Sequence, residues 1–260
     1  MHILLDPSAR PVVGHRGNAA HAPENTLEAI GQGLAAGADA VEFDVHVSAD
    51  GVPVVIHDPT VDRTTDGRGA VASMTVAQLQ TLDAGARFSR DGGRTYPYRG
   101  LGIRIPTLAE VLERHPLTQL LIEIKSPLAS TAVRRVLEVH SAMGRAVVAA
   151  FAAAGTHPFR DSGVAIGAAQ SEIARLIVPA LLRLRPRSLP FDVMCIPRSH
   201  RGIPLPIAAI VEAARPAGRL VHIWTIDDPW IARRLWAVGV RGIISNDPAS
   251  IIRARDELDG

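Results

Sequence analysis

The sequence predicts an α/β protein built as a TIM (β/α)8 barrel. Its 260 residues suit one such barrel, and strand-like and helix-like segments alternate almost throughout. No Gly-rich dinucleotide fingerprint follows any strand, which weakens the alternative of an open doubly wound sheet. The length alone would suit two small domains as well, but the number of alternating strands and helices fits one barrel, so we expect residues 1–260 to form a single domain.

Strands are expected where short apolar runs are bounded by turn residues. There are nine candidates, and one of them is only the return arm of a hairpin, which leaves the eight parallel strands of a barrel. They lie at residues 11–15, within 39–57 (a strand and its hairpin partner), and at 119–125, 146–151, 164–168, 191–196, 220–226 and 242–245.

Helices are expected between these strands, and two of them begin with clear capping signals. Asn25 with Glu28, and Thr107 with Glu110, each have the spacing of a capping box. A segment at 156–161 is less regular. The expected helices cover 25–36, a segment beginning at 107, and 131–143, 170–183, 205–215, 229–238 and 247–257.

The stretch at 59–104 is mostly turn-like, with several glycines and one short helix expected at 75–82. Its apolar content is low for a core. We therefore expect an insertion or lid, placed after the hairpin of the second strand, rather than a separate domain.

Composition limits the classes of partner. The net charge is only +2 and the arginines are scattered, so no nucleic-acid-binding surface is indicated. A single cysteine, Cys195, excludes a disulfide within the chain and fits a reducing compartment. The N-terminus does not read as a signal peptide, and no uncharged run approaches the roughly 20 residues of a membrane span. We expect a cytoplasmic protein.

One helical segment, at 173–184, has apolar residues on one side and arginines on the other. It is open to two interpretations, contact with a membrane surface or packing on the barrel. Pro179 is expected to interrupt it.

The segment at 41–57 places carboxylates and an imidazole together. Asp50-Gly51 is typical of a two-residue hairpin turn, and that turn pairs Asp44 directly with His57. Glu42 lies on the same face as Asp44, while the apolar residues between them face the other way. The alternative is that these polar residues have no functional role and only face solvent on the exposed side of a sheet.

In a TIM barrel the functional residues stand at the carboxyl ends of the strands. Three carboxylates converging there need protons or a cation. Oxygen ligands favour a hard divalent ion, Mg²⁺ or Ca²⁺, and no cysteine or multi-histidine set suggests zinc. The strand-end residues are His15, Arg16, Glu42, Asp44, His57, Asp58, Glu123, Lys125 and Trp224.

Two basic residues suit the same site to phosphate. The chain holds 27 arginines and one lysine, Lys125, which suggests a position too tight for a guanidinium. With Arg16, it would bind phosphate oxygens, while His15 and His57 would move protons in the cleavage of a phosphodiester. Taken singly, each histidine is more often structural than catalytic.

These residues belong to motifs that occur in order along residues 12–248, and the chain resembles the glycerophosphodiester phosphodiesterase family. No single motif is specific, but the ordered set is. The motifs are His-Arg-Gly at 15–17, Pro-Glu-Asn-Thr at 23–26, Glu-Phe-Asp-Val at 42–45, Val-Ile-His-Asp-Pro-Thr at 55–60, Pro-Thr-Leu-Ala-Glu-Val-Leu at 106–112, Glu-Ile-Lys at 123–125, Trp-Thr-Ile-Asp-Asp at 224–228 and Gly-Val-Arg-Gly-Ile-Ile-Ser-Asn-Asp-Pro at 239–248.

The resemblance implies a TIM barrel that hydrolyses small glycerophosphodiesters to sn-glycerol 3-phosphate and an alcohol, as part of lipid and glycerol metabolism. It implies one divalent cation, Mg²⁺ or Ca²⁺. The implied roles are metal ligands for Glu42, Asp44 and Glu123, acid and base for His15 and His57, phosphate binding for Arg16 and Lys125, a wall for glycerol at Trp224, and support of the metal site by Glu24 and Asn25.

Two residues depart from the family pattern. Asp227 stands where Asn is common, and Arg241 where an acidic residue often stands. The first puts substrate preference in doubt. Two further functions stay open, hydrolysis of lysophospholipids in the manner of a lysophospholipase D and binding of phosphodiesters without turnover. Attack by water and attack through a cyclic phosphate are equally compatible with the sequence. An amidohydrolase-type barrel is disfavoured, because the first strand lacks His-x-His.

Overall fold

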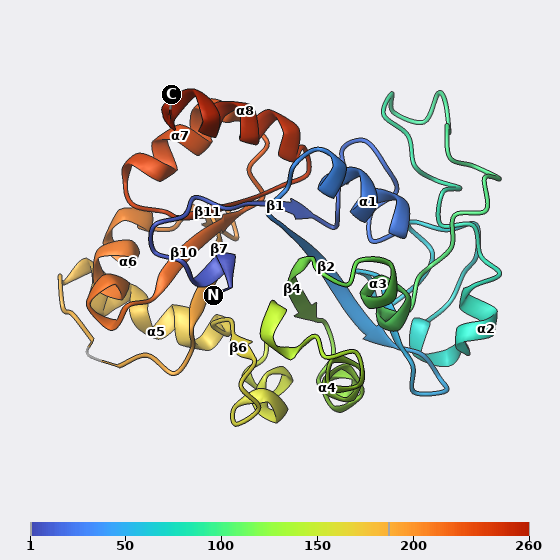
Figure 1. Ribbon diagram of the computed structural model, residues 1–260, viewed down its shortest axis with the longest axis horizontal. Coiled ribbons are helices and arrows are strands. Elements are labelled where there is room, and N and C mark those ends of the chain that lie inside the picture. Colours follow the sequence, from blue (N-terminus) through green and yellow to red (C-terminus); the bar gives the residue numbers. More distant parts are fainter. Residues whose placement is uncertain (1, 187, 260) are drawn as a thin grey trace.

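The computed structural model describes residues 2–186 and 188–259, and it confirms the predicted barrel. Parallel strands pair in the order β6-β5-β4-β2-β1-β11-β10-β7, and a parallel bridge from Gly167 to Val193 joins the two ends of that order (Figure 1). The strands are β1 (Val12–His15), β2 (Ala40–Val47), β4 (Gln119–Ile124), β5 (Ala146–Ala150), β6 (Ala165–Ile166), β7 (Val193–Pro197), β10 (Leu220–Trp224) and β11 (Gly242–Ser245).

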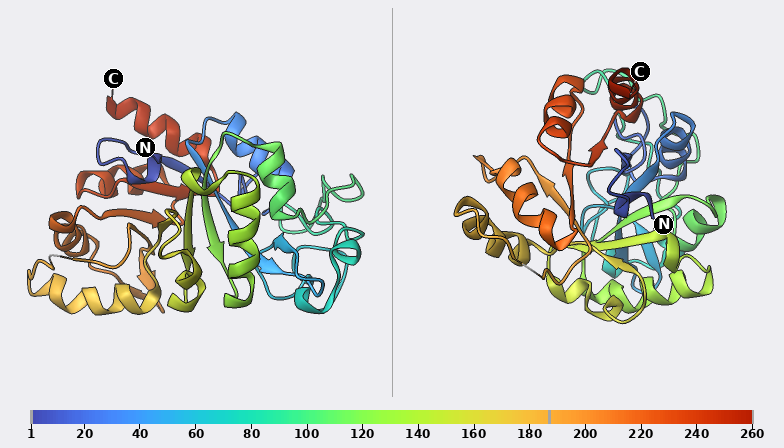
Figure 2. Two further views of the ribbon diagram at one scale, coloured as in Figure 1. Left: turned by 60° about the horizontal axis from the view of Figure 1, so that its bottom comes forward. Right: turned by 60° about the vertical axis from the view of Figure 1, so that its left-hand side comes forward.

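Helices surround the strands, as the two turned views in Figure 2 show. They are α1 (Leu27–Ala35), α3 (Leu108–Arg114), α4 (Ser130–Val139), α5 (Gln170–Leu181), α6 (Ile207–Ala214), α7 (Pro229–Ala237) and α8 (Pro248–Asp259). Between β5 and β6 the described chain forms the short 3-10 turns Ala153–Gly155 and His157–Phe159 instead of an α-helix. A two-stranded ribbon, β8 (Ser199–His200) with β9 (Ile203–Pro204), follows β7.

The alternation of side chains along the strands divides the core into layers. On β2, Val41, Phe43 and Val45 are buried against the surrounding helices, while Glu42 and Asp44 point to the barrel interior. The floor of the barrel is apolar, and the 3-10 helix Ile3–Leu5 packs against it. The strand pattern therefore places the polar side chains above an apolar floor.

One buried imidazole belongs to this floor rather than to the polar end. His222 on β10 is fully buried, with Nε2 2.9 Å from the Leu4 carbonyl oxygen. Its Nδ1 accepts a hydrogen bond of 2.7 Å from the Gly242 amide. Burial lowers the pKa of His222 to about 4, so the imidazole is neutral at pH 7.

The predicted pairing of Asp44 with His57 is wrong by one residue. In the hairpin of β2 and β3 (Pro53–Val55), Val45 pairs with Val55, and the Asp44 carbonyl accepts from the amide of Ile56 at 3.0 Å. His57 therefore follows the end of the ladder instead of facing Asp44 across it.

The reason is the turn, which has three residues instead of two. The Ser48 amide donates to the Val52 carbonyl at 3.0 Å, so Ala49, Asp50 and Gly51 form the loop. Gly51 adopts φ +81°, the left-handed conformation that closes loops of this length. The Ser48 hydroxyl donates to Asp50 at 2.6 Å, and this contact selects the longer loop.

The start of α1 also differs from the prediction. Thr26, not Asn25, caps the helix, and its hydroxyl accepts from the Ala29 amide at 3.2 Å. Asn25 sits one residue outside with φ +59°, and Glu28 makes no capping box. Asn and Thr are both good N-cap residues, but the Asn25 side chain hydrogen-bonds Asp44 on β2 instead. The predicted capping box of Thr107 with Glu110 is confirmed.

Helix α5 contains Pro179 without interruption and ends two residues later. A proline in the last turn costs a single hydrogen bond, so the helix continues past it. Leu176 and Ala180 pack on the barrel, whereas Val178 and Leu181 are exposed. Among the described residues, no helix is long and apolar enough to cross a membrane.

The segment at 59–104 lies to one side of the barrel, at the right of Figure 1. It carries the short helix α2 (Val76–Leu79), which begins with the capping box of Thr75 and Gln78. A small apolar cluster that includes Val61, Val71 and Leu79 joins it to the hairpin arm through Val54 and Ile56. The segment thus packs on β3 and has some core of its own.

Candidate active site

The turn after β1 brings a backbone amide and a guanidinium to the polar end of the barrel. Arg16 has φ +51°, and its amide donates to the Glu42 carboxylate at 3.0 Å. The turn needs glycine on both sides. A Cβ on Gly14 would lie 2.2 Å from the Gly17 carbonyl oxygen, and one on Gly17 would lie 2.4 Å from the Ala29 carbonyl carbon.

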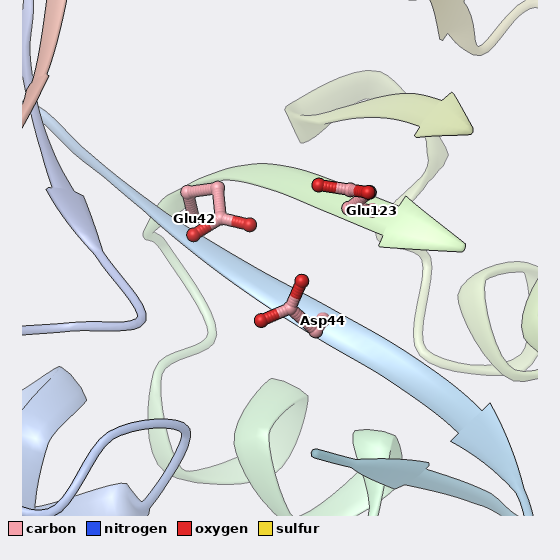
Figure 3. Close-up of side chains that lie close together, drawn as sticks. All are labelled: Glu42, Asp44 and Glu123. Carbon is pink, nitrogen blue, oxygen red and sulfur yellow. The ribbon is translucent and has the colours of Figure 1, made fainter. Parts of the chain in front are cut away.

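Three carboxylates converge beside this turn, from two neighbouring strands (Figure 3). Glu42 and Asp44 extend from β2 and Glu123 from β4, and one oxygen of each lies within 4.8 Å of the others. Glu42 and Asp44 are almost fully buried. Burial, with Asp44 and Glu123 adding to it, raises the pKa of Glu42 well above its usual range. The cluster therefore disfavours a further negative charge at Glu42.

Two cationic side chains flank the cluster. Lys125 places Nζ 3.2 Å from Asp44 and 3.0 Å from Glu123, and Arg16 places Nε 3.2 Å from Asp44. Burial would raise the pKa of Asp44, but Lys125 and Arg16 hold it below its usual value. The Arg16 Nε contact lacks hydrogen-bond geometry, so it is an ion pair only.

Asn25 and Glu24 hold these groups in place. The Asn25 amide donates to the Asp44 carboxylate at 2.9 Å and accepts from the Asp44 backbone amide at 3.1 Å. The left-handed backbone of Asn25 makes this two-point contact possible. Glu24 accepts from Arg16 Nη1 at 2.7 Å.

His15, at the end of β1, is oriented by a chain of two residues. Asp227 accepts from Asn246 Nδ2 at 2.9 Å, and the Asn246 Oδ1 lies 2.7 Å from His15 Nδ1. A carboxylate only accepts, so the Asn246 amide must turn its oxygen toward His15. Nδ1 of His15 therefore carries a hydrogen, which leaves Nε2 as an acceptor 3.8 Å from Glu42. Burial, with Arg16 adding to it, lowers the pKa of His15.

His57 is oriented by its neighbour in sequence. Its Nδ1 lies 2.6 Å from Asp58 Oδ1. A hydrogen bond from Arg63 lowers the pKa of Asp58 to about 2, so this carboxylate is ionised and accepts. His57 thus carries a hydrogen on Nδ1 and leaves Nε2 free, as in His15.

An aromatic pair stands next to Lys125. The rings of Trp224 and Phe151 meet edge to face with centroids 6.5 Å apart. Lys125 Nζ lies 5.4 Å from the centroid of Phe151, which links this pair to the carboxylates. Trp224 Nε1 donates to the Cys195 carbonyl at 3.1 Å, which fixes the indole.

The structure brings the predicted site residues to one end of the barrel. Most of them are joined by direct contacts or through one intermediate residue, whereas His57 is joined to Glu24 through two, Asp58 and Arg63. Sequence reasoning missed the roles of Asn246, Asp227, Arg63 and Phe151. Asn246 follows β11 directly, so the rule of strand ends could have found it. Arg63 lies in the segment at 59–104, where no sequence rule indicated a contact with the site.

A closed barrel that collects carboxylates, cations and imidazoles at its strand ends belongs to the class of TIM-barrel enzymes. The glycerophosphoryl diester phosphodiesterase family model matches residues 15–250. This match covers most of the chain. The protein therefore belongs to the glycerophosphoryl diester phosphodiesterase family, a family of hydrolases.

Individual relatives agree with this assignment. The chain is 32% identical to a glycerophosphodiester phosphodiesterase of Caldanaerobacter subterraneus, over 93% of this chain and 96% of the relative. A crystal structure of the glycerophosphoryl diester phosphodiesterase domain of a Mycobacterium tuberculosis protein superposes with a TM-score of 0.82 at 26% identity, covering 96% of this chain and 100% of that one. An Oleispira antarctica phosphodiesterase, solved in complex with the product sn-glycerol-3-phosphate, gives a TM-score of 0.77 at 27% identity, covering 95% and 96% of the two chains.

Proposed function

We propose that this protein hydrolyses glycerophosphodiesters to sn-glycerol 3-phosphate and an alcohol, with a divalent cation and two histidines. The observation that carries the proposal is the shared orientation of the imidazoles. Both His15 and His57 are held at Nδ1 by a side-chain oxygen, which leaves Nε2 of each for proton transfer. The complex of the Oleispira antarctica relative with sn-glycerol-3-phosphate supports the product.

The residues at the carboxylate cluster fit a hard divalent cation. Glu42, Asp44 and Glu123 offer only oxygen atoms, from two rigid strands, and burial keeps them from full hydration. Mg²⁺ or Ca²⁺, when bound there, would supply positive charge at the phosphoryl oxygens and make the attacking hydroxyl or water easier to deprotonate. Asn25 would support the cluster by holding Asp44, and Glu24 would support it by holding Arg16.

The chain's own residues would then perform binding and proton transfer. Arg16 and Lys125, which flank the carboxylates, would bind the non-bridging phosphate oxygens. One imidazole would take the proton from the nucleophile, and the other would protonate the leaving alkoxide. Trp224 would form a wall for the glycerol moiety. Direct attack by water and attack by the neighbouring hydroxyl of the substrate both need this pair of imidazoles.

The test is release of sn-glycerol 3-phosphate from glycerophosphocholine, glycerophosphoethanolamine and glycerophosphoglycerol. Metal-stripped protein should be inactive, and Mg²⁺ or Ca²⁺ added back should restore turnover. The variant Asp44→Asn should need much more cation for half-maximal activity, while Asp161→Asn, in the chain between β5 and β6, should behave as wild type. Equal turnover with and without a strong chelator would contradict the cation requirement.

A second candidate, hydrolysis of lysophospholipids, is favoured by Phe151. This ring is half exposed beside Trp224 and offers apolar surface next to the phosphate-binding residues. Choline released from a lysophospholipid but not from glycerophosphocholine would decide for it. Binding of these diesters without turnover would instead identify a non-catalytic phosphodiester-binding protein.

We further propose that the protein acts in the cytoplasm, in the recycling of glycerol and lipid head groups, and that residues 59–104 form a lid of the one barrel domain. The single free cysteine supports a reducing compartment. The packing of this segment on β3, next to His57, supports the lid. Cell fractionation with an antibody to the chain tests the location.

A further inference from the structure

One side chain of the segment at 59–104 reaches the catalytic end of the barrel. The Arg63 guanidinium donates to two carboxylates that lie on different loops, Glu24 after β1 and Asp58 after β3. Nη1 and Nη2 meet the two Glu24 oxygens at 2.7 and 2.8 Å, and Nε and Nη2 meet the two Asp58 oxygens at 2.6 and 3.2 Å. Each carboxylate thus receives two hydrogen bonds from Arg63.

The contacts continue from both carboxylates into the site. Asp58 holds Nδ1 of His57 at 2.6 Å, and Glu24 holds Nη1 of Arg16 at 2.7 Å. Arg16 in turn lies 3.2 Å from Asp44. The guanidinium of Arg63 therefore joins the His57 imidazole to the Arg16 guanidinium through one carboxylate on each side.

His57 depends on this connection more than His15 does. His15 belongs to a barrel strand with neighbours on both sides. His57 instead lies two residues beyond β3, a three-residue arm that pairs with β2 on one side and makes a single bridge, from Val54 to Thr107, on the other. Among the described residues, Asp58 is the side chain that hydrogen-bonds the His57 imidazole. Among the described residues of the segment at 59–104, Arg63 is the cation that contacts Asp58 and Glu24.

We propose that Arg63 is a positioning residue that fixes Asp58 and Glu24, and through them the His57 imidazole and the Arg16 guanidinium, in one arrangement. The inference rests on the proposed function. The planar guanidinium presents donors along two edges, and it serves two carboxylates at once in a way that the ammonium of lysine does not.

The test compares Arg63→Ala and Arg63→Lys with a matched control, Arg104→Ala. Arg104 is an exposed arginine of the same segment, and its ion pair is with Glu110, away from the site. Because 47% of the Arg63 side chain is exposed, its ion pairs contribute little to folding stability, and all three variants should melt within a few degrees of wild type.

In kinetics on glycerophosphocholine, Arg63→Ala should lose about 10- to 100-fold in kcat, with a smaller change in KM, and Arg63→Lys should lose nearly as much. Millimolar guanidinium ion should restore part of the activity of Arg63→Ala and none to His57→Gln. A folded Arg63→Ala variant with wild-type kcat overturns the proposal.

A second readout does not depend on turnover. In ring ¹⁵N spectra of the whole protein, His57, assigned with His57→Gln, should show one tautomer with the hydrogen on Nδ1. In Arg63→Ala the two ring nitrogens should move toward averaged shifts, while Arg104→Ala leaves them unchanged. If wild type hydrolyses no diester, the proposed function fails, and these spectra still test whether Arg63 positions His57. If wild type is active but the spectra of Arg63→Ala equal those of wild type, the positioning role of Arg63 fails and the proposed function stands.

Discussion

The two histidines of the site present the same nitrogen but are held by different means. His15 stands on a barrel strand, and a neutral amide, Asn246, orients it. His57 stands beyond a hairpin arm, and a charged pair, Asp58 with Arg63, orients it. Where the backbone belongs to a strand that is paired on both sides, a neutral amide beside the imidazole selects the tautomer. Where the backbone lies beyond the end of a short arm, the chain uses ionic contacts with a separate segment.

The comparison predicts that both imidazoles are needed although their supports differ. His15→Gln and His57→Gln remove the proposed proton carriers, and each should lower kcat by about 10²- to 10⁴-fold. The measurement is release of sn-glycerol 3-phosphate under saturating cation. The exposed His157→Gln is the control and should keep wild-type activity. Full activity in either site variant would remove that imidazole from the mechanism.

Replacing the supports should have a smaller effect than removing the imidazoles. Asp58→Asn keeps an acceptor for His57 but loses the charge that pairs with Arg63, and Asn246→Ala removes the acceptor for His15. Both should lose about 10- to 100-fold in kcat. The two variants should differ in how their remaining activity depends on salt, measured between about 0.05 and about 0.5 M sodium chloride. The remaining activity of Asn246→Ala should fall with salt as wild type does, and that of Asp58→Asn should be less affected.

A buried imidazole outside the site is expected to affect stability rather than turnover. His222 lies in the barrel floor and is neutral when folded, because burial lowers its pKa from 6.5 to about 4. Protonation favours the unfolded chain, so stability is full above pH 6.5 and falls as the pH drops toward 4. The loss from this one residue approaches about 3 kcal/mol.

Denaturant unfolding of wild type and His222→Gln between these pH values tests this prediction. His2, His15, His46 and His115 also have lowered pKa values, so only the difference between the two proteins isolates His222. Parallel pH profiles for the two proteins would show that His222 contributes nothing to the acid sensitivity.

The smallest effect is expected from the loss of a helix cap. Thr107 caps α3 and closes its capping box with Glu110. Thr107→Ala should lower the free energy of unfolding by about 1 kcal/mol and leave kcat unchanged. Urea unfolding and the diester assay on one preparation check both parts. A loss of kcat would mean that the position of α3 is coupled to the site.

The sequence predicted the features that depend on a repeated pattern, and it missed those that depend on a single residue. Glu42 and Asp44 were predictable as inward-facing residues because a two-residue period persists along any strand with one face buried. Their convergence with Glu123 followed because carboxyl ends of parallel strands meet at one end of a barrel. These conclusions depend on local periodicity and on a fold that is closed by many similar strands.

The errors lie where one residue decides the geometry. A single extra loop residue, chosen by the contact of Ser48 with Asp50, moved His57 out of register with Asp44. The helix cap moved from Asn25 to Thr26 because the Asn25 amide finds a better partner in Asp44. The contact of Arg63 with Glu24 joins residues 39 apart in the chain, and no local pattern encodes such a distance.

Lys125 has a practical consequence. It is the only lysine among the 260 residues, and its ammonium lies between Asp44 and Glu123. Amine-directed isotopic methylation would therefore place one side-chain label in the whole protein, at the proposed metal site, with the chain's amino terminus as the other amine. Its resonance would report cation and phosphate arriving at the site, in a molecule otherwise unaltered in sequence.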